Sequence, residues 1–186
     1  MRKNFVAKPY MYPQPVLIIA AYDEAGVPNA MNAAWGCIAD YKQVALYLSG
    51  EHKTVKNILQ RQAFTISMAD KRHVTECDYV GIVSGNKEPD KFRKAGFHAT
   101  KSEFVDAPLI DELPMALECK LLSFDVESEL LIGEIINVSA DESILDEEGK
   151  IDPVKLVPIT FDAVHNTYIT LGEKAGNAFK DGNKLK

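Results

Sequence analysis

The sequence contains little cysteine, and the three residues it has stand apart. Cys37, Cys77 and Cys119 form no Cys-x-x-C pair, and their number is odd. The four histidines show no i,i+4 pairing and have no cysteine at metal-ligand spacing, which argues against a zinc site. We therefore expect three buried, reduced thiols and no bound metal.

Long apolar runs and nucleotide motifs are also missing. No run approaches the roughly 20 residues that a membrane helix needs, and residues 1–15 lack the apolar segment of a signal peptide. The net charge of −6 disfavours a nucleic-acid partner. Neither a Walker A loop nor G-x-G-x-x-G is present. These absences predict a cytoplasmic protein that binds neither membrane nor nucleic acid.

The length and composition suit one folded domain. The chain has 186 residues, of which 46% are hydrophobic and 26% charged, as in soluble globular proteins. We expect a single domain over 1–186, in which prolines keep residues 1–14 as an extended N-terminal arm. Residues 173–186 are expected to form a partly helical C-terminal tail.

Short apolar and alternating segments predict a mainly β fold. The expected strands are 15–23, 43–50, 63–69, 116–128 and 129–141, with the last two forming a hairpin that turns at Ser128 and Glu129. Further extended segments bring the count to six or seven. Short helices are expected from His52, over 73–85 and over 89–96. Strands follow one another without βαβ alternation, which favours a closed antiparallel barrel with peripheral helices.

The segment GEHKTVKN has the composition of a phosphate site. It places Lys53, Thr54, Lys56 and Asn57 in the first turn of a helix that Thr54 could cap. Basic side chains there oppose the helix dipole unless an anion lies nearby. The alternative is that the run forms only a solvated helix face.

The segment NAMNAAW, residues 29–35, could hold a flat ligand. Its small side chains allow close approach to the backbone, and its asparagines offer both donors and acceptors. Trp35 offers a flat apolar wall. The alternative is a buried strand with a core tryptophan.

Several segments in order along the chain resemble the flavin reductase-like, FMN-binding split-barrel family, and within it the flavoredoxin branch. They include NAMNAAW, HKTVKN, DKFRKAGF, ECK, LIGEIINV and YITLGEKAGNAF. The resemblance implies a six-stranded antiparallel split barrel, a homodimer, and FMN bound non-covalently near the dimer interface. No catalytic side chain is implied, because the chemistry takes place on FMN.

The resemblance also implies which residues contact FMN. The ring and ribityl chain would meet Asn29, Ala30, Met31, Asn32, Ala33, Ala34 and Trp35. The ribityl and phosphate would meet Ser49, His52, Lys53, Thr54 and Asn57. Lys91 would be a second cationic contact, and Phe161 would lie near the ring. The alternatives are that Lys91 is a solvated helix lysine and that Phe161 is a core residue without contact to the ligand. Ser128-Glu129 stands where the family often has histidine.

Three functions remain open at this point. The protein is expected to be a flavoredoxin-type oxidoreductase or electron carrier with bound FMN, served by NAD(P)H or a redox protein. It could instead be an NAD(P)H:flavin reductase that supplies reduced flavin to an oxygenase. A flavin-binding protein without turnover is the third alternative.

Overall fold

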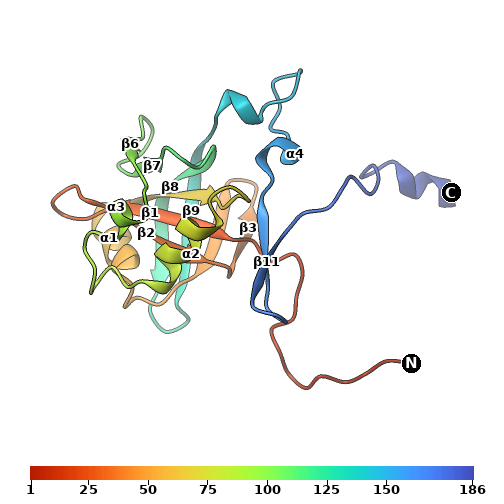
Figure 1. Cartoon of the computed structure of the whole chain (residues 1–186), viewed down its shortest axis with the longest axis horizontal. Helices are drawn as coiled ribbons and strands as arrows, with labels where there is room; N and C mark the ends of the chain where they lie inside the picture. The colour runs from red at the N-terminus through yellow and green to blue at the C-terminus, as the bar shows by residue number, and fades with distance from the viewer.

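The computed structural model describes residues 1–186 and is built around one curled antiparallel sheet (Figure 1). The sheet has seven strands in the order β2-β1-β5-β8-β9-β4-β3. Their bounds are β1 Leu17–Tyr22, β2 Pro28–Ala33, β3 Gly36–Asp40, β4 Gln43–Tyr47, β5 Ala63–Met68, β8 Met115–Asp125 and β9 Leu130–Ala140. The expected mainly β split barrel is confirmed.

The sheet has one strand more than the six expected, for a local reason. β2 and β3 lie at opposite ends of the strand order, yet only Ala34 and Trp35 separate them in the chain. One extended segment therefore breaks at these two residues: β2 pairs with β1, and β3 pairs with β4. This segment joins the two edges of the sheet and closes the barrel covalently.

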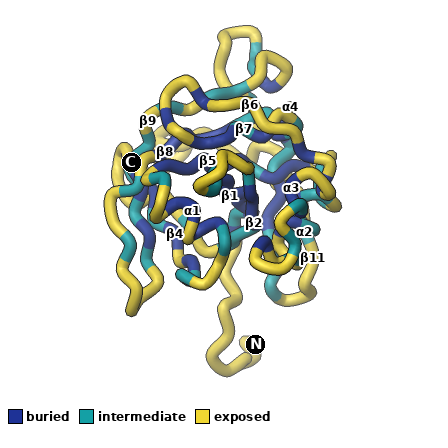
Figure 2. Tube along the Cα trace, turned by 90° about the vertical axis from the view of Figure 1, so that its left-hand side faces the viewer, coloured by how far each residue is buried: buried dark blue, intermediate teal, exposed yellow.

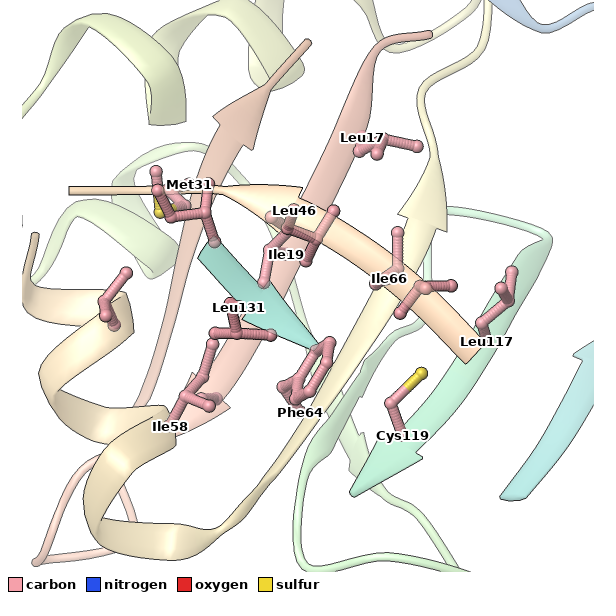
Figure 3. Packing of buried hydrophobic residues seen from close by; sticks show 14 residues of the cluster. Leu17, Ile19, Met31, Leu46, Ile58, Phe64, Ile66, Leu117, Cys119 and Leu131 are labelled. Carbon is pink, nitrogen blue, oxygen red and sulfur yellow. The ribbon is translucent and has the colours of Figure 1, made fainter. Parts of the chain in front are cut away.

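Both faces of β1 are buried, which explains its uninterrupted apolar sequence. Leu17 and Ile19 point into the barrel with 12 other buried residues, among them Phe64 and Leu131 (Figure 3). Ile18 and Ala20 point outward into a second cluster of 13 buried residues. Strands covered on both sides lose the polar–apolar alternation of half-exposed strands.

The helices α2 Val74–Ile82 and α3 Lys91–Lys94 cover the outer face of β1 and β2 (Figure 1). The helix α1 Lys53–Arg61 instead packs Val55 and Ile58 into the cluster inside the barrel. The smaller elements are the pair β6 Ala99–Lys101 and β7 Pro108–Ile110, the 3-10 turn Glu142–Ile144, α4 Pro153–Leu156, the pair β10 Ile159–Asp162 and β11 Thr167–Thr170, and the 3-10 turn Asp181–Leu185. None of the helices combines the length and apolar character needed to cross a membrane.

The two ends of the chain extend away from the barrel (Figures 1 and 2). Residues 1–13 and 171–186 are exposed throughout. The arm attaches at its last residues, where the Tyr12 hydroxyl donates to Asp162 and the Gln14 N–H donates to Thr160 Oγ1 at 2.9 Å. These hydrogen bonds tie the extended arm to β10.

The cysteine prediction is right for two residues and wrong for one. Cys77 and Cys119 are buried, and burial raises the pKa of each thiol to about 12. Cys37 is exposed, because it lies on β3 at the edge of the sheet with no element covering its outer face. Nowhere do three His, Cys, Asp or Glu side chains gather as metal ligands.

Candidate functional site

A small polar pocket lies where β2, the start of α1 and the segment after α2 meet. Its volume is about 100 Å³. It is lined by Asn29, Met31, Asn32, His52, Lys53, Thr54, Gly81, Val83, Ser84, Gly85 and Lys91. Seven of these eleven belong to the fourteen residues that the sequence suggested, so the structure joins the two candidate segments into one site.

The N-terminus of α1 faces this pocket without a side-chain cap. His52 is the N-cap residue, its side chain makes no capping hydrogen bond, and the first turn holds no acidic residue. The expectation that Thr54 caps the helix is wrong, because Thr54 is the second helical residue and its hydroxyl has another partner. The helix end therefore keeps N–H donors and a partial positive charge for an anion.

The two candidate segments are tied together by one buried hydrogen bond. Asn29 Nδ2 donates to Thr54 Oγ1 at 2.6 Å, and both residues are buried. The Thr54 hydroxyl keeps its own proton for a ligand. Lys53 supplies the charge: its side chain is about one-third exposed, and its nearest carboxylate is Asp23, with Nζ and Oδ2 4.0 Å apart. That distance leaves the lysine able to bind an anion.

Two glycines, one in the last turn of α2 and one just after it, form the part of the pocket that sequence reasoning missed. A Cβ on Gly85 would lie 2.5 Å from Asn29 Oδ1, and one on Gly81 would lie 2.9 Å from the Cβ of Asn32. The backbone of this segment can approach β2 only because both positions are glycine. The available signal was the sequence VSG at 83–85, where a glycine follows the expected helix.

Gly85→Ala tests this close approach. We expect a loss of about 1–3 kcal/mol in the free energy of unfolding, because the added methyl displaces Asn29 from Thr54. Thermal or urea unfolding measures the loss. Gly172→Ala is the matched control, since a Cβ there meets nothing within 4 Å. Equal stability of the two variants would contradict the packing described.

Lys91 is buried in the wall of the same pocket. It is 3% exposed, and its ammonium donates to the backbone oxygens of Val80 and Val83, both at 2.9 Å. Burial lowers its pKa to about 8. The alternative of a solvated helix lysine is therefore wrong, because the exposed face of α3 is formed by Arg93 and Lys94 instead.

The other seven candidates lie outside the polar pocket. Ala30 is fully buried in the outer cluster, and the Asn57 amide turns to Ala21 O at 3.5 Å. Phe161 is half-buried and packs on Tyr168 beside that outer cluster. The remaining four are Ala33, Ala34, Trp35 and Ser49. A ligand confined to the pocket would not touch this second group.

Trp35 marks a larger groove at the far end of β2. The alternative of a core tryptophan is wrong, since the side chain is 58% exposed. It lines a groove of about 470 Å³ together with Ala34, Tyr47 and four residues at the end of the arm, Met11, Pro13, Gln14 and Pro15. No charged residue lines this groove, so it suits an uncharged, flat group.

The predicted hairpin turn at Ser128 and Glu129 is confirmed. β8 ends at Asp125 and β9 begins at Leu130. The Asp125 carboxylate accepts from the Ser128 N–H and hydroxyl at 2.7 and 2.6 Å, and Glu129 adopts a φ of 58°. These residues line neither the polar pocket nor the Trp35 groove.

The chain belongs to the flavin reductase like domain family, whose match covers residues 10–162. It is similar to the flavoredoxin of Desulfovibrio vulgaris (Miyazaki F), with 38% identity, a TM-score of 0.93, and coverage of 98% of this chain and 100% of the other. The flavoredoxin from Methanosarcina acetivorans is 27% identical, with a TM-score of 0.89 and full coverage of both chains. An uncharacterized protein of Aquifex aeolicus (strain VF5) is 24% identical, with 79% of each chain covered.

Family membership and the two flavoredoxins support a flavin-linked redox role for this chain. A nitrilotriacetate monooxygenase component B from Bacillus cereus, 22% identical with a TM-score of 0.76 over 90% of this chain and 89% of the other, shares the fold. The side chains around the pocket are compatible with that role. They offer cations, hydroxyls and backbone N–H groups, and no nucleophile–base pair is among them.

Proposed function

We propose that the chain is an FMN-binding flavoprotein of flavoredoxin type that transfers electrons or hydride through bound FMN. The observation that carries this proposal is the convergence of Lys53, Thr54 and the uncapped α1 N-terminus on one small pocket. A dianionic phosphate matches this set of a cation, a hydroxyl and backbone N–H groups.

The length of β2 suits the ribityl chain and the ring system of FMN, which extend beyond its phosphate. The pocket of about 100 Å³ is too small for a whole flavin, since pockets for ligands of that size hold roughly 300–1,000 Å³. The strand leads from Asn29 toward Trp35, a path of about 20 Å at the usual rise per residue. The proposed arrangement has the phosphate at the α1 end and the isoalloxazine toward Trp35.

Each part of the chain then has a separate task. Lys53 and Thr54 hold the phosphate, and Asn29 and Asn32 offer amide groups along the strand. The exposed indole of Trp35 provides apolar surface beside the ring. When bound, FMN supplies the hydride or electron transfer, while the chain supplies binding, orientation and electrostatics.

The proposal includes a homodimer. The open end of the barrel has an apolar cavity of about 410 Å³, lined by residues such as Ile38, Met68 and Val138. Ile38 is 63% exposed and Val138 46% exposed. Exposed apolar surface of this kind marks interaction sites. A second copy would cover it.

An absorbance spectrum of the purified protein, with the released cofactor identified by mass, tests the function. We expect flavin bands that persist through dialysis and a released mass equal to that of FMN. A protein that loses its flavin on dialysis and oxidises NAD(P)H only with added flavin would indicate a flavin reductase. A protein that binds FMN and exchanges no electrons would indicate a binding protein.

A further inference from the structure

Lys91 caps the C-terminus of α2. Its ammonium donates to Val80 O and Val83 O, both at 2.9 Å. In the last turn of a helix, carbonyl oxygens lack intrahelical donors and carry the negative end of the helix dipole. A cation is the strongest available partner for them, and this one is 97% withdrawn from solvent.

The segment that Lys91 holds forms the wall of the polar pocket opposite β2. Val83, Ser84 and Gly85 line the pocket directly after the capped helix end. Gly85 approaches Asn29 so closely that an added Cβ would lie 2.5 Å from Asn29 Oδ1. The two hydrogen bonds of Lys91 therefore fix the position of this wall. Through the wall they also fix the side chain of Asn29, which donates to Thr54.

Lys91 also has one donor left for a ligand. An ammonium carries three N–H groups, and the chain accepts two of them. The other charged or titratable groups lining the pocket are His52 and Lys53, and no carboxylate lines it. The nearby acids just before α3, Asp90 and Glu88, pair with Arg93 and Lys94. Nothing anionic in the pocket compensates Lys91.

We propose that Lys91 is a positioning residue whose protonated ammonium clamps residues 81–85 against β2, and that loss of its proton, which removes the charge from both hydrogen bonds, loosens this clamp and weakens the binding of phosphate-bearing ligands. The inference rests on the proposed function and deepens it. A lysine that only contacted the phosphate would act when ligand is bound. The clamp is instead expected to loosen residues 81–85 on loss of the Lys91 proton even when no ligand is present.

Burial places this change in mildly alkaline solution. The pKa of Lys91 is lowered from 10.5 to about 8 by its withdrawal from water. The clamp is thus charged and strong below pH 8, and it weakens as the pH rises through that value, because the neutral amine keeps two N–H donors but no charge. Since folding depresses this pKa, the titration of Lys91 raises global stability between pH 8 and 10.5. Above pH 9 the buried thiols of Cys77 and Cys119, whose pKa is raised from 9.0 to about 12, act in the opposite direction. Circular dichroism at each pH therefore separates a fall in affinity from unfolding.

The first test is the affinity for FMN between pH 7 and 10, with riboflavin as the ligand without phosphate. We expect FMN affinity to fall as the pH rises through 8 and to level off about tenfold below its value at pH 7, and riboflavin affinity to change far less. The phosphate of FMN, with its second pKa at about 6, stays dianionic throughout. Lys91→Met should bind FMN about tenfold more weakly at pH 7 and show no such slope.

Lys53→Ala is the matched variant, because it removes a cation from the same pocket and leaves the clamp. It should bind FMN more weakly and keep the pH slope. A slope that survives in Lys91→Met would overturn the inference while FMN binding itself stands. Failure of the wild type to bind FMN at any pH would instead overturn the proposed function.

The second test needs no ligand and no variant. Amide hydrogen exchange over residues 81–85 should quicken as the pH passes 8, after correction for the intrinsic pH dependence of exchange. Lys91→Met should show the fast rate already at pH 7, with near-ultraviolet circular dichroism confirming that it is folded. Unchanged protection of this segment in both cases would contradict the clamp.

Discussion

Removing the Lys53 ammonium and the Thr54 hydroxyl together should cost FMN binding tens-fold or more and riboflavin binding only a few-fold. Lys53 and Thr54 line the pocket at the N-terminus of α1. Hydrogen bonds that involve a charged group are each worth roughly 1.5–3 kcal/mol. Losing two of them lowers the affinity for FMN tens-fold or more, and riboflavin, which has no phosphate, does not lose them. Titration of Lys53→Ala/Thr54→Ala with both flavins measures the difference.

Lys56→Ala is the control for that experiment. It removes the same charge from the same helix, but its Nζ pairs with Glu51 Oε2 at 2.9 Å and does not line the pocket. We expect FMN affinity within about twofold of the wild type, because an exposed ion pair contributes little. Equal losses of FMN and riboflavin in the double variant would exclude a phosphate role for this helix end.

Phe64→Ala should be the most damaging single change to the fold. Phe64 is fully buried in the barrel (Figure 3). Its ring lies so close to Gly133 that a Cβ on that glycine would fall 2.4 Å from Phe64 Cζ. The ring thus fills the space that the glycine leaves. Truncation to alanine should cost about 3–5 kcal/mol and lower the melting temperature by roughly 10 °C.

Phe104→Ala is the matched control, since Phe104 is 54% exposed. It should change the free energy of unfolding by less than about 0.5 kcal/mol. Phe64→Leu should recover much of the loss, because it restores apolar volume. Similar unfolding curves for Phe64→Ala and Phe104→Ala would show that the barrel interior is not packed around this ring.

The strands could be predicted because their sequences carry the pattern that burial requires. The apolar segment that became β1 predicts a buried strand, and it is covered on both faces. The hairpin of β8 and β9 followed from two adjacent apolar segments and a polar turn. The break at Ala34 and Trp35 was not visible, because the change of strand partner depends on barrel closure and not on local sequence.

The site was only partly predictable, and Lys91 shows why. DKFRKAG has the pattern of an exposed basic helix, and nothing local marks one lysine as buried. Its acceptors are backbone oxygens of α2, which the folded chain brings to it. In the same way, the wall at Gly81 and Gly85 is defined by its contact with β2. Local sequence predicted the charged end of the site, while the opposing wall depends on tertiary packing.

A crystal structure of the protein soaked with FMN tests the central claim most directly. We expect the phosphate within hydrogen-bond distance of Lys53 Nζ and the first N–H groups of α1, with the isoalloxazine lying along β2 toward Trp35. A phosphate bound elsewhere, or a pocket between β2 and α1 filled by the protein's own side chains at saturating FMN, would contradict it.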